Sequence, residues 1–240
     1  MVGNSELAYR MLARKYGADF CFTEMVNCEI FLKTKQNPIS NMWYTTNELD
    51  RPLIIQICGH DELKMLQTSL ILQNYCDAID INLGCPQEIA RKGYYEKAGA
   101  KMITVHGRTR EQRGINTGFA SWEHIKQIKL NVNIPVIANG GIIYSRHIDE
   151  CIDYTNCDGI MVAETHLYNP LIFSTIKKSS LEIYEEFLVL HGKYKNKYDL
   201  KNIKSHSYKM LQVILKNKPE LREELNKCKD LESFLIFINF

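Results

Sequence analysis

The sequence predicts an α/β fold, because strand-like apolar runs alternate with segments of helical periodicity through the first 176 of the 240 residues. Polar residues and glycines gather where each expected strand ends, which is the face on which a (β/α)8 barrel builds its sites. From residue 177 onwards only helical periodicity remains. These observations predict a TIM (β/α)8-type barrel, incomplete with about six strands, followed by a small C-terminal helical domain.

Six runs of apolar and β-branched residues account for the expected strands. They are Asp19–Val26, Pro52–Cys58, Ala78–Leu83, Met102–His106, Ile134–Ala138 and Gly159–Ala163. Strands joined through helices form right-handed parallel units with the helices on the outside. Periodicity alone does not separate a closed barrel from an open doubly wound sheet, and the polar strand ends favour the barrel.

Helical periodicity fills the segments between these strands. The expected helices are Ser5–Tyr16, with Ser5 as N-cap, Asp61–Asn74, Ser121–Lys129 and Ser145–Tyr154. In the tail a further helix is expected over Lys201–Asn217, and Pro219 can open the next one. We therefore expect residues 1–176 to form the α/β domain and residues 177–240 the helical domain.

The composition of the chain argues against a membrane protein, a secreted protein and a metal-binding protein. Hydrophobic residues make up 45% of the chain, and the longest apolar runs are strand-sized, so we expect a soluble protein without a membrane span. The N-terminus lacks a signal-peptide pattern, so a cytoplasmic location is expected, with nuclear and mitochondrial locations left open. The eight cysteines form no CxxC pair and are interpreted as reduced thiols, and the His and Cys residues lack the spacing of metal ligands.

The formal net charge of +2 conceals an asymmetry between the two parts of the chain. Residues 177–240 hold 13 Lys and Arg residues against 9 Asp and Glu, whereas residues 1–176 hold 17 against 19. A basic tail is weak support for a polyanionic partner, because lysine-rich helices are more commonly just solvated faces.

The clearest candidate for chemistry is Cys85, in the sequence Ile-Asn-Leu-Gly-Cys-Pro at the end of the third expected strand. Gly84 allows a tight turn and Pro86 can open the next helix, so the thiol would be displayed at the strand end. Such a junction can also carry Gly and Cys by chance. The neighbouring motifs favour catalysis.

A second candidate is the run Asn139, Gly140 and Gly141 after the fifth expected strand. Glycines at such a place let backbone N–H groups approach an anion, and a phosphate there would also face a helix N-terminus. Judged alone, an Asn-Gly-Gly sequence is more often only a turn. Within a barrel, it falls where phosphates are commonly held.

The fourth expected strand ends at His106 and is followed by Arg108 and Arg110. A neutral imidazole could hydrogen-bond a flavin or base carbonyl and the arginines could hold phosphates, or the segment is only a capped strand with solvated arginines. Gln56 is polar within a buried strand and needs a partner, either a ligand or a backbone group.

Four motifs in this order resemble the tRNA-dihydrouridine synthases. They are Asn-Leu-Gly-Cys-Pro-Gln, Thr-Val-His-Gly-Arg-Thr, Pro-Val-Ile-Ala-Asn-Gly-Gly-Ile and Val-Ala-Glu-Thr-His-Leu-Tyr-Asn-Pro. The subgroup they most resemble is the eukaryotic one that modifies uridines 16 and 17 of the tRNA D-loop. The resemblance implies FMN in the barrel mouth, reduced by NADPH or NADH, and hydride transfer to C6 of a uridine. Cys85 would protonate C5 as general acid.

The same resemblance assigns the remaining site residues. Those implied to bind the flavin, by its ring or by its phosphate, are Gln56, His106, Asn139, Gly140, Gly141, Ala163 and Glu164. Those implied on the side of the RNA are Asn82, Arg108 and Arg110. Many relatives have Gly-Arg where this chain has Ala163 and Glu164, although the subgroup itself often has Ala-Glu. The helical tail would grip the tRNA by shape and charge, and no obligate protein partner is indicated.

Two departures from the family pattern count against activity. The chain starts inside the motif of the family's first barrel strand, and from Tyr95 it passes directly to Glu96, omitting the strand that carries a flavin-contacting lysine. An incomplete barrel would expose strand edges. We therefore expect poor FMN binding and a tendency to aggregate for this chain expressed alone.

Two alternatives stay open at this point. One is a non-catalytic or truncated tRNA-binding relative that keeps the basic tail, which retained tRNA binding without bound flavin would identify. The other is another FMN barrel oxidoreductase with a small-molecule substrate. The basic helical tail argues against the second alternative.

Overall fold

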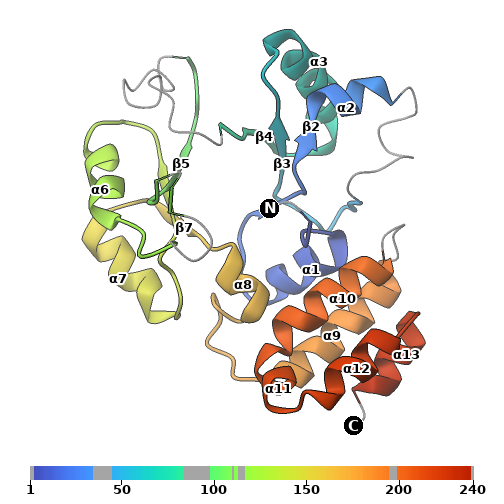
Figure 1. The fold of residues 1–240 in the computed structure, drawn as a ribbon. Coiled ribbons are helices and arrows are strands. Elements are labelled where there is room, and N and C mark those ends of the chain that lie inside the picture. Colours follow the sequence, from blue (N-terminus) through green and yellow to red (C-terminus); the bar gives the residue numbers. More distant parts are fainter. Residues whose placement is uncertain are drawn as a thin grey trace. The chain divides into compact units, whose positions relative to one another are not determined.

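The computed structural model describes residues 3–34, 45–83, 98–109, 111–112, 117–194 and 199–238. The chain divides into two compact units, one made of residues 1–82 and 167–240 and the other of residues 83–166. Each unit contains its own parallel sheet with helices packed beside it (Figure 1). The expected α/β class with parallel sheets is therefore confirmed.

The sheet of the first unit is built around one strand, β3. Its strands are β1 (Cys21–Phe22), β2 (Val26–Asn27), β3 (Leu53–Cys58) and β4 (Ala78–Ile81). β3 pairs in parallel with each of the other three. The long-range pairing of β3 thus holds together segments that lie more than 20 residues apart in the chain.

The single strand expected over Asp19–Val26 is wrong, because this run forms two short strands with an interruption between them. The register with β3 shifts by one residue between Cys21 and Val26, so the run contains one residue more than the segment it pairs with, as in a β-bulge. Thr23 lies in the interruption and donates its backbone N–H to the Ile54 carbonyl at 2.9 Å.

Two helices, α2 (Cys28–Lys33) and α3 (Glu62–Leu72), cover one face of the sheet. The alternation of side chains along β3 determines which of its residues point toward these helices. The buried cluster beside these helices consists of Val26, Cys28, Phe31, Leu53, Ile55, Ile57 and Leu72. Three members of this cluster are alternate residues of β3. Because successive side chains of a strand point to opposite faces, Gln56 lies on the face away from this cluster.

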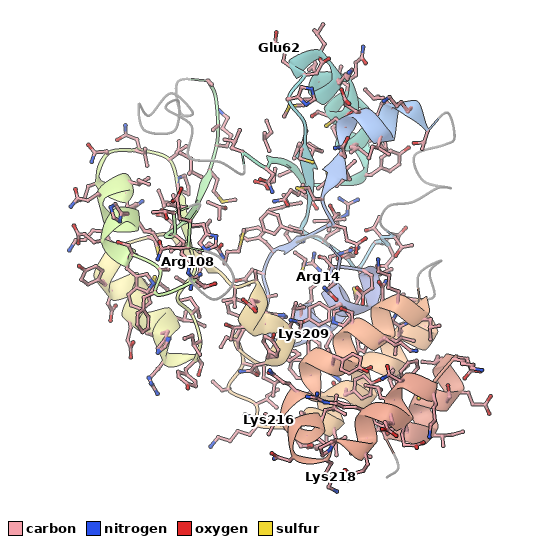
Figure 2. The ribbon with its side chains drawn as sticks, viewed as in Figure 1. Arg14, Glu62, Arg108, Lys209, Lys216 and Lys218 are labelled. Carbon is pink, nitrogen blue, oxygen red and sulfur yellow. The ribbon has the colours of Figure 1, made fainter. Side chains whose placement is uncertain are left out.

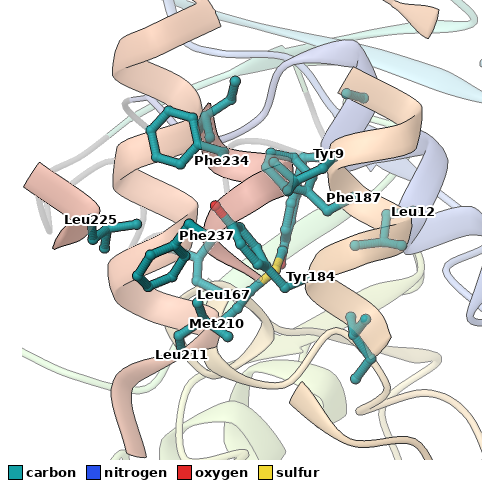
Figure 3. Close-up of a cluster of buried hydrophobic side chains, with 14 of the residues drawn as sticks. Tyr9, Leu12, Leu167, Tyr184, Phe187, Met210, Leu211, Leu225, Phe234 and Phe237 are labelled. Carbon is teal, nitrogen blue, oxygen red and sulfur yellow. The ribbon is translucent and has the colours of Figure 1, made fainter. Parts of the chain in front are cut away.

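The other helices of the first unit share a second core. They are α1 (Leu7–Lys15), α9 (Ser180–Lys193), α10 (Asp199–Met210), α11 (Gln212–Asn217), α12 (Glu220–Lys227) and α13 (Leu231–Phe237). Figure 3 shows Tyr9 and Leu12 of α1 in this core together with Tyr184 and Phe187 of α9. The rings of Tyr9 and Phe187 meet edge to face with centroids 6.3 Å apart. Helix α1 therefore packs with the helices of the C-terminal tail.

This packing does not follow the domain boundary expected between residues 176 and 177. The first unit joins residues 1–82 with residues 167–240, because α1 buries its apolar face against α9. The division into a catalytic part and a tRNA-binding part concerns function and stays a prediction.

The tail also differs from the sequence prediction in one helix. The helix expected over Lys201–Asn217 is broken at Leu211, whose φ of −95° and ψ of 13° depart from helical values. The break allows Met210, Leu211 and Leu215 all to enter the buried core. Burial of these side chains outweighs the continuous helical periodicity of the segment.

The start of α1 differs as well. Ser5 does not cap the helix, because the N-cap position is occupied by Glu6, whose side chain makes no capping hydrogen bond. Ser5 instead donates its hydroxyl to the carbonyl of Phe22 at the end of β1. A tertiary contact has therefore replaced the local cap that the sequence suggested.

A buried ion-pair network joins α1 to the segment that precedes β3. Nη2 of Arg10 lies 2.7 Å from Oδ2 of Asp50, and Nε of Arg14 lies 3.1 Å from Oδ1 of the same carboxylate. The side chains of Arg10 and Asp50 are 2% and 0% exposed. Thr46 adds a hydroxyl donor at 3.1 Å. Because buried charges need such partners, this network fixes how the helix meets the sheet.

The second unit has a three-stranded parallel sheet in the order β5-β6-β7. Its elements are β5 (Ile103–His106), α6 (Trp122–Leu130), β6 (Val136–Asn139), α7 (Arg146–Thr155) and β7 (Gly159–Met161), and α8 (Glu164–Tyr168) begins at its end. His106 pairs with Asn139, and Asn139 pairs with Met161, so the three strands end at one edge of the sheet. In the part of the chain that the structure describes, no helix is long and apolar enough to cross a membrane.

Candidate functional site

The first unit places three polar side chains together at the carboxyl end of its sheet. Gln56 on β3 pairs with Asp80 on β4, and Asn82 follows two residues later. Nε2 of Gln56 donates to Oδ2 of Asp80 at 2.6 Å, and Nδ2 of Asn82 donates to Oε1 of Gln56 at 3.4 Å. The partner that Gln56 required is therefore a pair of side chains, where we expected a ligand or a backbone group. We call these three residues the amide cluster.

The interruption between β1 and β2 supports the amide cluster. The backbone N–H of Gln56 donates to Oγ1 of the buried Thr23 at 3.3 Å, and Nδ2 of Asn82 lies 3.2 Å from Sδ of Met25. Sequence reasoning missed Thr23, Met25 and Asp80. Only Asp80 gave a signal in the sequence, as a charged residue inside an otherwise apolar strand.

The second unit places a glycine turn at the end of β6. Gly140 and Gly141 have φ values of +100° and +83°, which favour glycine. A Cβ on Gly141 would lie 2.9 Å from Nε1 of Trp122, and one on Gly140 would lie 3.0 Å from the His106 ring. Within the described residues, neither glycine N–H donates to another backbone group, so both are available to an anion.

His106 and Arg108 form a pair after β5. Nη1 of Arg108 lies 3.2 Å from Nε2 of His106, and the guanidinium also donates to the carbonyls of Thr117 at 3.1 Å and Gly118 at 3.2 Å. A guanidinium can only donate, so Nε2 accepts and the imidazole is neutral. Partial burial and the Arg108 cation both lower the pKa of His106, which agrees with a neutral ring.

The remaining predicted residues of this unit lie at the ends of β6 and β7. Nδ2 of Asn139 donates to a β7 carbonyl at 2.8 Å, so this side chain ties the two strands together. Ala163 is half-buried, whereas Glu164 is exposed and begins α8. Thr165, which sequence reasoning missed, donates Oγ1 to the carbonyl of Ile142 at 2.7 Å and joins this segment to the glycine turn.

The predicted site residues thus fall into two groups, one in each unit. Gln56 and Asn82 belong to the amide cluster. The second group, which we call the glycine-turn cluster, consists of His106, Arg108, Asn139, Gly140 and Gly141. Cys85 and Arg110 lie outside the described residues.

Each cluster, taken by itself, has groups that suit one part of FMN, the cofactor that the motifs imply. The glycine turn offers backbone N–H groups and space that a Cβ would fill, which suits a phosphate. The amide cluster both donates and accepts hydrogen bonds, which suits the heteroatoms of a flavin ring. Two features fit less well. Glu164 supplies a negative charge after β7, and the flavin-contacting lysine of the family pattern has no counterpart in this sequence.

A family model described as dihydrouridine synthase (Dus) matches residues 1–95 and 93–239. The chain is 36% identical over 278 positions to the NAD(P)(+) tRNA-dihydrouridine(16/17) synthase-like protein of Mus musculus, which covers 97% of this chain and 58% of that protein. It is 34% identical to the tRNA-dihydrouridine(16/17) synthase of Schizosaccharomyces pombe, over 98% of this chain and 74% of that protein.

The mouse relative is longer than this chain. The chain spans less than two thirds of the length of the mouse protein, and the alignment with that protein covers 278 positions, more than the 240 residues present here. The mouse protein therefore contains residues that have no counterpart in this chain. The two segments matched by the family model meet at residues 93–95, where the sequence predicted an internal omission. Matches of this extent show that the chain belongs to the dihydrouridine synthase (Dus) family.

Proposed function

We propose that this chain carries the activity of a tRNA-dihydrouridine synthase, the reduction of uridines in the tRNA D-loop with FMN as cofactor and NADPH or NADH as reductant. The observation that carries this proposal is the contact between His106 and the glycine turn, since a Cβ on Gly140 would lie 3.0 Å from that imidazole. A neutral ring beside two glycine N–H groups, neither of which donates to a backbone group among the described residues, suits a cofactor that joins a polar ring to a phosphate. The names of the relatives favour tRNA over a small-molecule substrate.

The proposal includes the architecture expected for the family. We infer that the fold is a TIM (β/α)8-type barrel, incomplete in this chain. In each sheet polar residues lie at the carboxyl ends of the parallel strands, which supports this inference, because barrel enzymes build their sites at such strand ends. A cytoplasmic location also remains part of the proposal.

The residues of the glycine-turn cluster and Cys85 have distinct roles in the proposed reaction. Bound FMN would supply the hydride that reaches C6 of uridine. Gly140 and Gly141 would hold its phosphate through backbone N–H groups, and His106 would present a neutral imidazole to the ring. Cys85 would then donate its thiol proton to C5, which a thiol can do because its ordinary pKa of about 8.5 keeps it protonated at neutral pH.

The helical tail would bind the body of the tRNA. Lys216 and Lys218, labelled in Figure 2 at the end of α11, are exposed and free to meet phosphates. Lys209 is engaged within the protein, because its Nζ donates to the Tyr168 hydroxyl at 2.8 Å and lies 4.7 Å from the centre of that ring. Lysine contacts to phosphates weaken as salt rises, so this part of the binding would be salt-dependent.

One observation favours a second candidate function, tRNA binding without reduction. The family model matches this chain in two segments that meet at residues 93–95, and the mouse relative has residues with no counterpart here. A chain that lacks part of the flavin site could keep the basic tail and still bind tRNA. Loss of flavin binding with retained tRNA binding would identify this function.

The experiment that separates the two functions measures dihydrouridine directly. The purified chain is incubated with an unmodified tRNA transcript, excess FMN and NADPH, and the digested RNA is analysed by mass spectrometry. The proposed reaction adds two hydrogen atoms to D-loop uridines, and omission of FMN or of NADPH abolishes the gain. An unchanged RNA mass at full FMN saturation, together with tRNA binding in a filter assay, would replace the first function by the second.

A further inference from the structure

The hydrogen bond between Gln56 and Asp80 has a fixed direction. Nε2 of Gln56 lies 2.6 Å from Oδ2 of Asp80, and an ionised carboxylate can only accept. The amide nitrogen of Gln56 must therefore face Asp80, which leaves Oε1 on the other side. The charged acceptor makes this one of the stronger hydrogen bonds of the sheet end.

The orientation of the Gln56 amide also determines which amide atom of Asn82 faces it. Oε1 of Gln56 can only accept, and Nδ2 of Asn82 lies 3.4 Å from it. The same Nδ2 lies 3.2 Å from Sδ of Met25, which is also an acceptor. Both neighbours therefore select the amide nitrogen of Asn82, so that its Oδ1 is left for a ligand. A single carboxylate sets the orientation of two amides.

The three side chains share the face of the sheet that α2 and α3 leave uncovered. Gln56 and Asp80 are register partners on neighbouring parallel strands, and such partners point to the same face. The alternate residues Ile55, Ile57 and Ile79 pack in the cluster under the helices. Asp80 is therefore not a member of the apolar core and lies half-exposed at this end of the sheet.

We propose that Asp80 is a positioning residue that fixes the amide orientations of Gln56 and Asn82 for the flavin ring. This inference rests on the proposed function and extends it to a residue that acts through two neighbouring amides. Without the carboxylate each amide can rotate by half a turn and exchange its donor for its acceptor. A ligand must then order both amides when it binds, and its affinity falls.

The first test follows the two amides in the protein without ligand. The side-chain N–H signals of Gln56 and Asn82 are recorded by ¹⁵N nuclear magnetic resonance for the wild type and for Asp80→Asn, which keeps the size but can also donate. We expect both pairs of signals to shift in the variant. Asp80→Glu, which restores a pure acceptor, brings them back toward the wild type. Unmoved Asn82 signals would overturn the inference.

The second test measures FMN affinity by quenching of flavin fluorescence. We expect Asp80→Asn to weaken FMN binding by on the order of tenfold, with partial recovery in Asp80→Glu. Asp77→Asn is the matched control, because Asp77 lies just before β4 and pairs with Arg51 and the Leu53 N–H, remote from the two amides. Equal affinity of Asp80→Asn and wild type would refute the positioning role.

The two tests separate failure of this inference from failure of the proposed function. If the wild type binds no FMN, the proposed function fails, and the amide signals still decide whether Asp80 orients the amides. If FMN binds but the side-chain N–H signals of Asn82 do not shift in Asp80→Asn, the inference alone fails. Because Asp80→Glu keeps the charge and the acceptor, it remains informative if Asp80→Asn does not fold.

Discussion

Nη1 of Arg108 lies 3.2 Å from Nε2 of His106, a pairing in which the guanidinium donates and the imidazole accepts. The same guanidinium is fixed by the carbonyl of Gly118, so its position does not depend on the histidine alone. Because Nε2 accepts, the proton of the neutral ring resides on Nδ1. The pair therefore leaves Nδ1 of the imidazole as a hydrogen-bond donor.

Removal of the arginine should raise the pKa of His106. Burial and the Arg108 cation both lower this pKa, and Arg108→Ala removes only the second cause. The value should rise toward, but stay below, the ordinary value of about 6.5. A pH titration of the His106 ring protons by nuclear magnetic resonance measures it.

The lowered pKa of His106 also determines how the stability of the fold changes with pH. The folded wild type binds the His106 proton less readily than the unfolded chain, so this group destabilises the fold as pH falls below about 6.5. Arg108→Ala should weaken that pH dependence. A pKa that falls or stays constant in Arg108→Ala would contradict the proposed pairing.

Gly141→Ala should destabilise the second unit more than a glycine substitution in open space does. The added Cβ would meet Nε1 of Trp122 at 2.9 Å, and the φ of +83° is strained for alanine. Gly99→Ala is the control, since its φ is +93° but no atom lies within 4 Å of the added Cβ. Strain alone costs about 1–2 kcal/mol, and the close contact adds about 1–3 kcal/mol. Equal unfolding free energies of the two variants in urea would show that the contact is absent.

Asp50→Asn should strongly destabilise the first unit. The substitution removes the negative charge that Arg10 and Arg14 share in a site where Asp50 is 0% exposed. Leaving buried charge uncompensated costs about 3–5 kcal/mol. Glu224→Gln breaks the exposed pair with Lys227 and should destabilise the protein far less, because solvent screens exposed pairs. Chemical denaturation measures both, and similar values would argue against a buried network.

Glu186 should stabilise the contact between α1 and α9 in a pH-dependent way. Burial raises the pKa of this carboxyl, but hydrogen bonds from Lys15, Lys178 and Tyr16 lower it more, and the pKa falls to about 2. A carboxyl with a lowered pKa stabilises the fold above its ordinary value near 4.5, and this stabilisation is lost as pH falls toward 2.

Thermal unfolding of Glu186→Gln tests this sign. The variant should unfold at a lower temperature than the wild type at pH 6, and the difference should shrink steadily below pH 4.5. Glu185→Gln, on the exposed face of α9, should change little at either pH. A difference between Glu186→Gln and wild type that stays constant down to pH 2 would rule out the lowered pKa.

Much of the fold followed from the sequence because buried strands leave a strong apolar signal. Five of the six expected strands each match one strand, the first expected run forms two, and the glycine turn lies where the Asn-Gly-Gly sequence indicated. The interruption at Thr23 could not be foreseen, since a β-bulge is set by the register with β3, a partner more than 20 residues away. Likewise the break at Leu211 reflects burial in a shared core rather than local periodicity.

The candidate site followed from the sequence only in part. Gln56, His106 and the glycines were found because each is unusual in its local setting. Asp80 was passed over, because its role depends on lying beside Gln56 across two strands, which no local pattern records. In the same way, the packing of α1 with the C-terminal helices depends on contacts between the two ends of the chain.

The rate of dihydrouridine formation by Cys85→Ala tests the proposed chemistry most directly. With FMN and NADPH in excess, Cys85→Ala lacks the proton donor, so its rate should fall by at least about 10²-fold relative to the wild type. Cys76→Ala, which replaces a half-buried thiol, should keep the wild-type rate. Uridine reduction by Cys85→Ala at the wild-type rate would contradict the role assigned to this thiol.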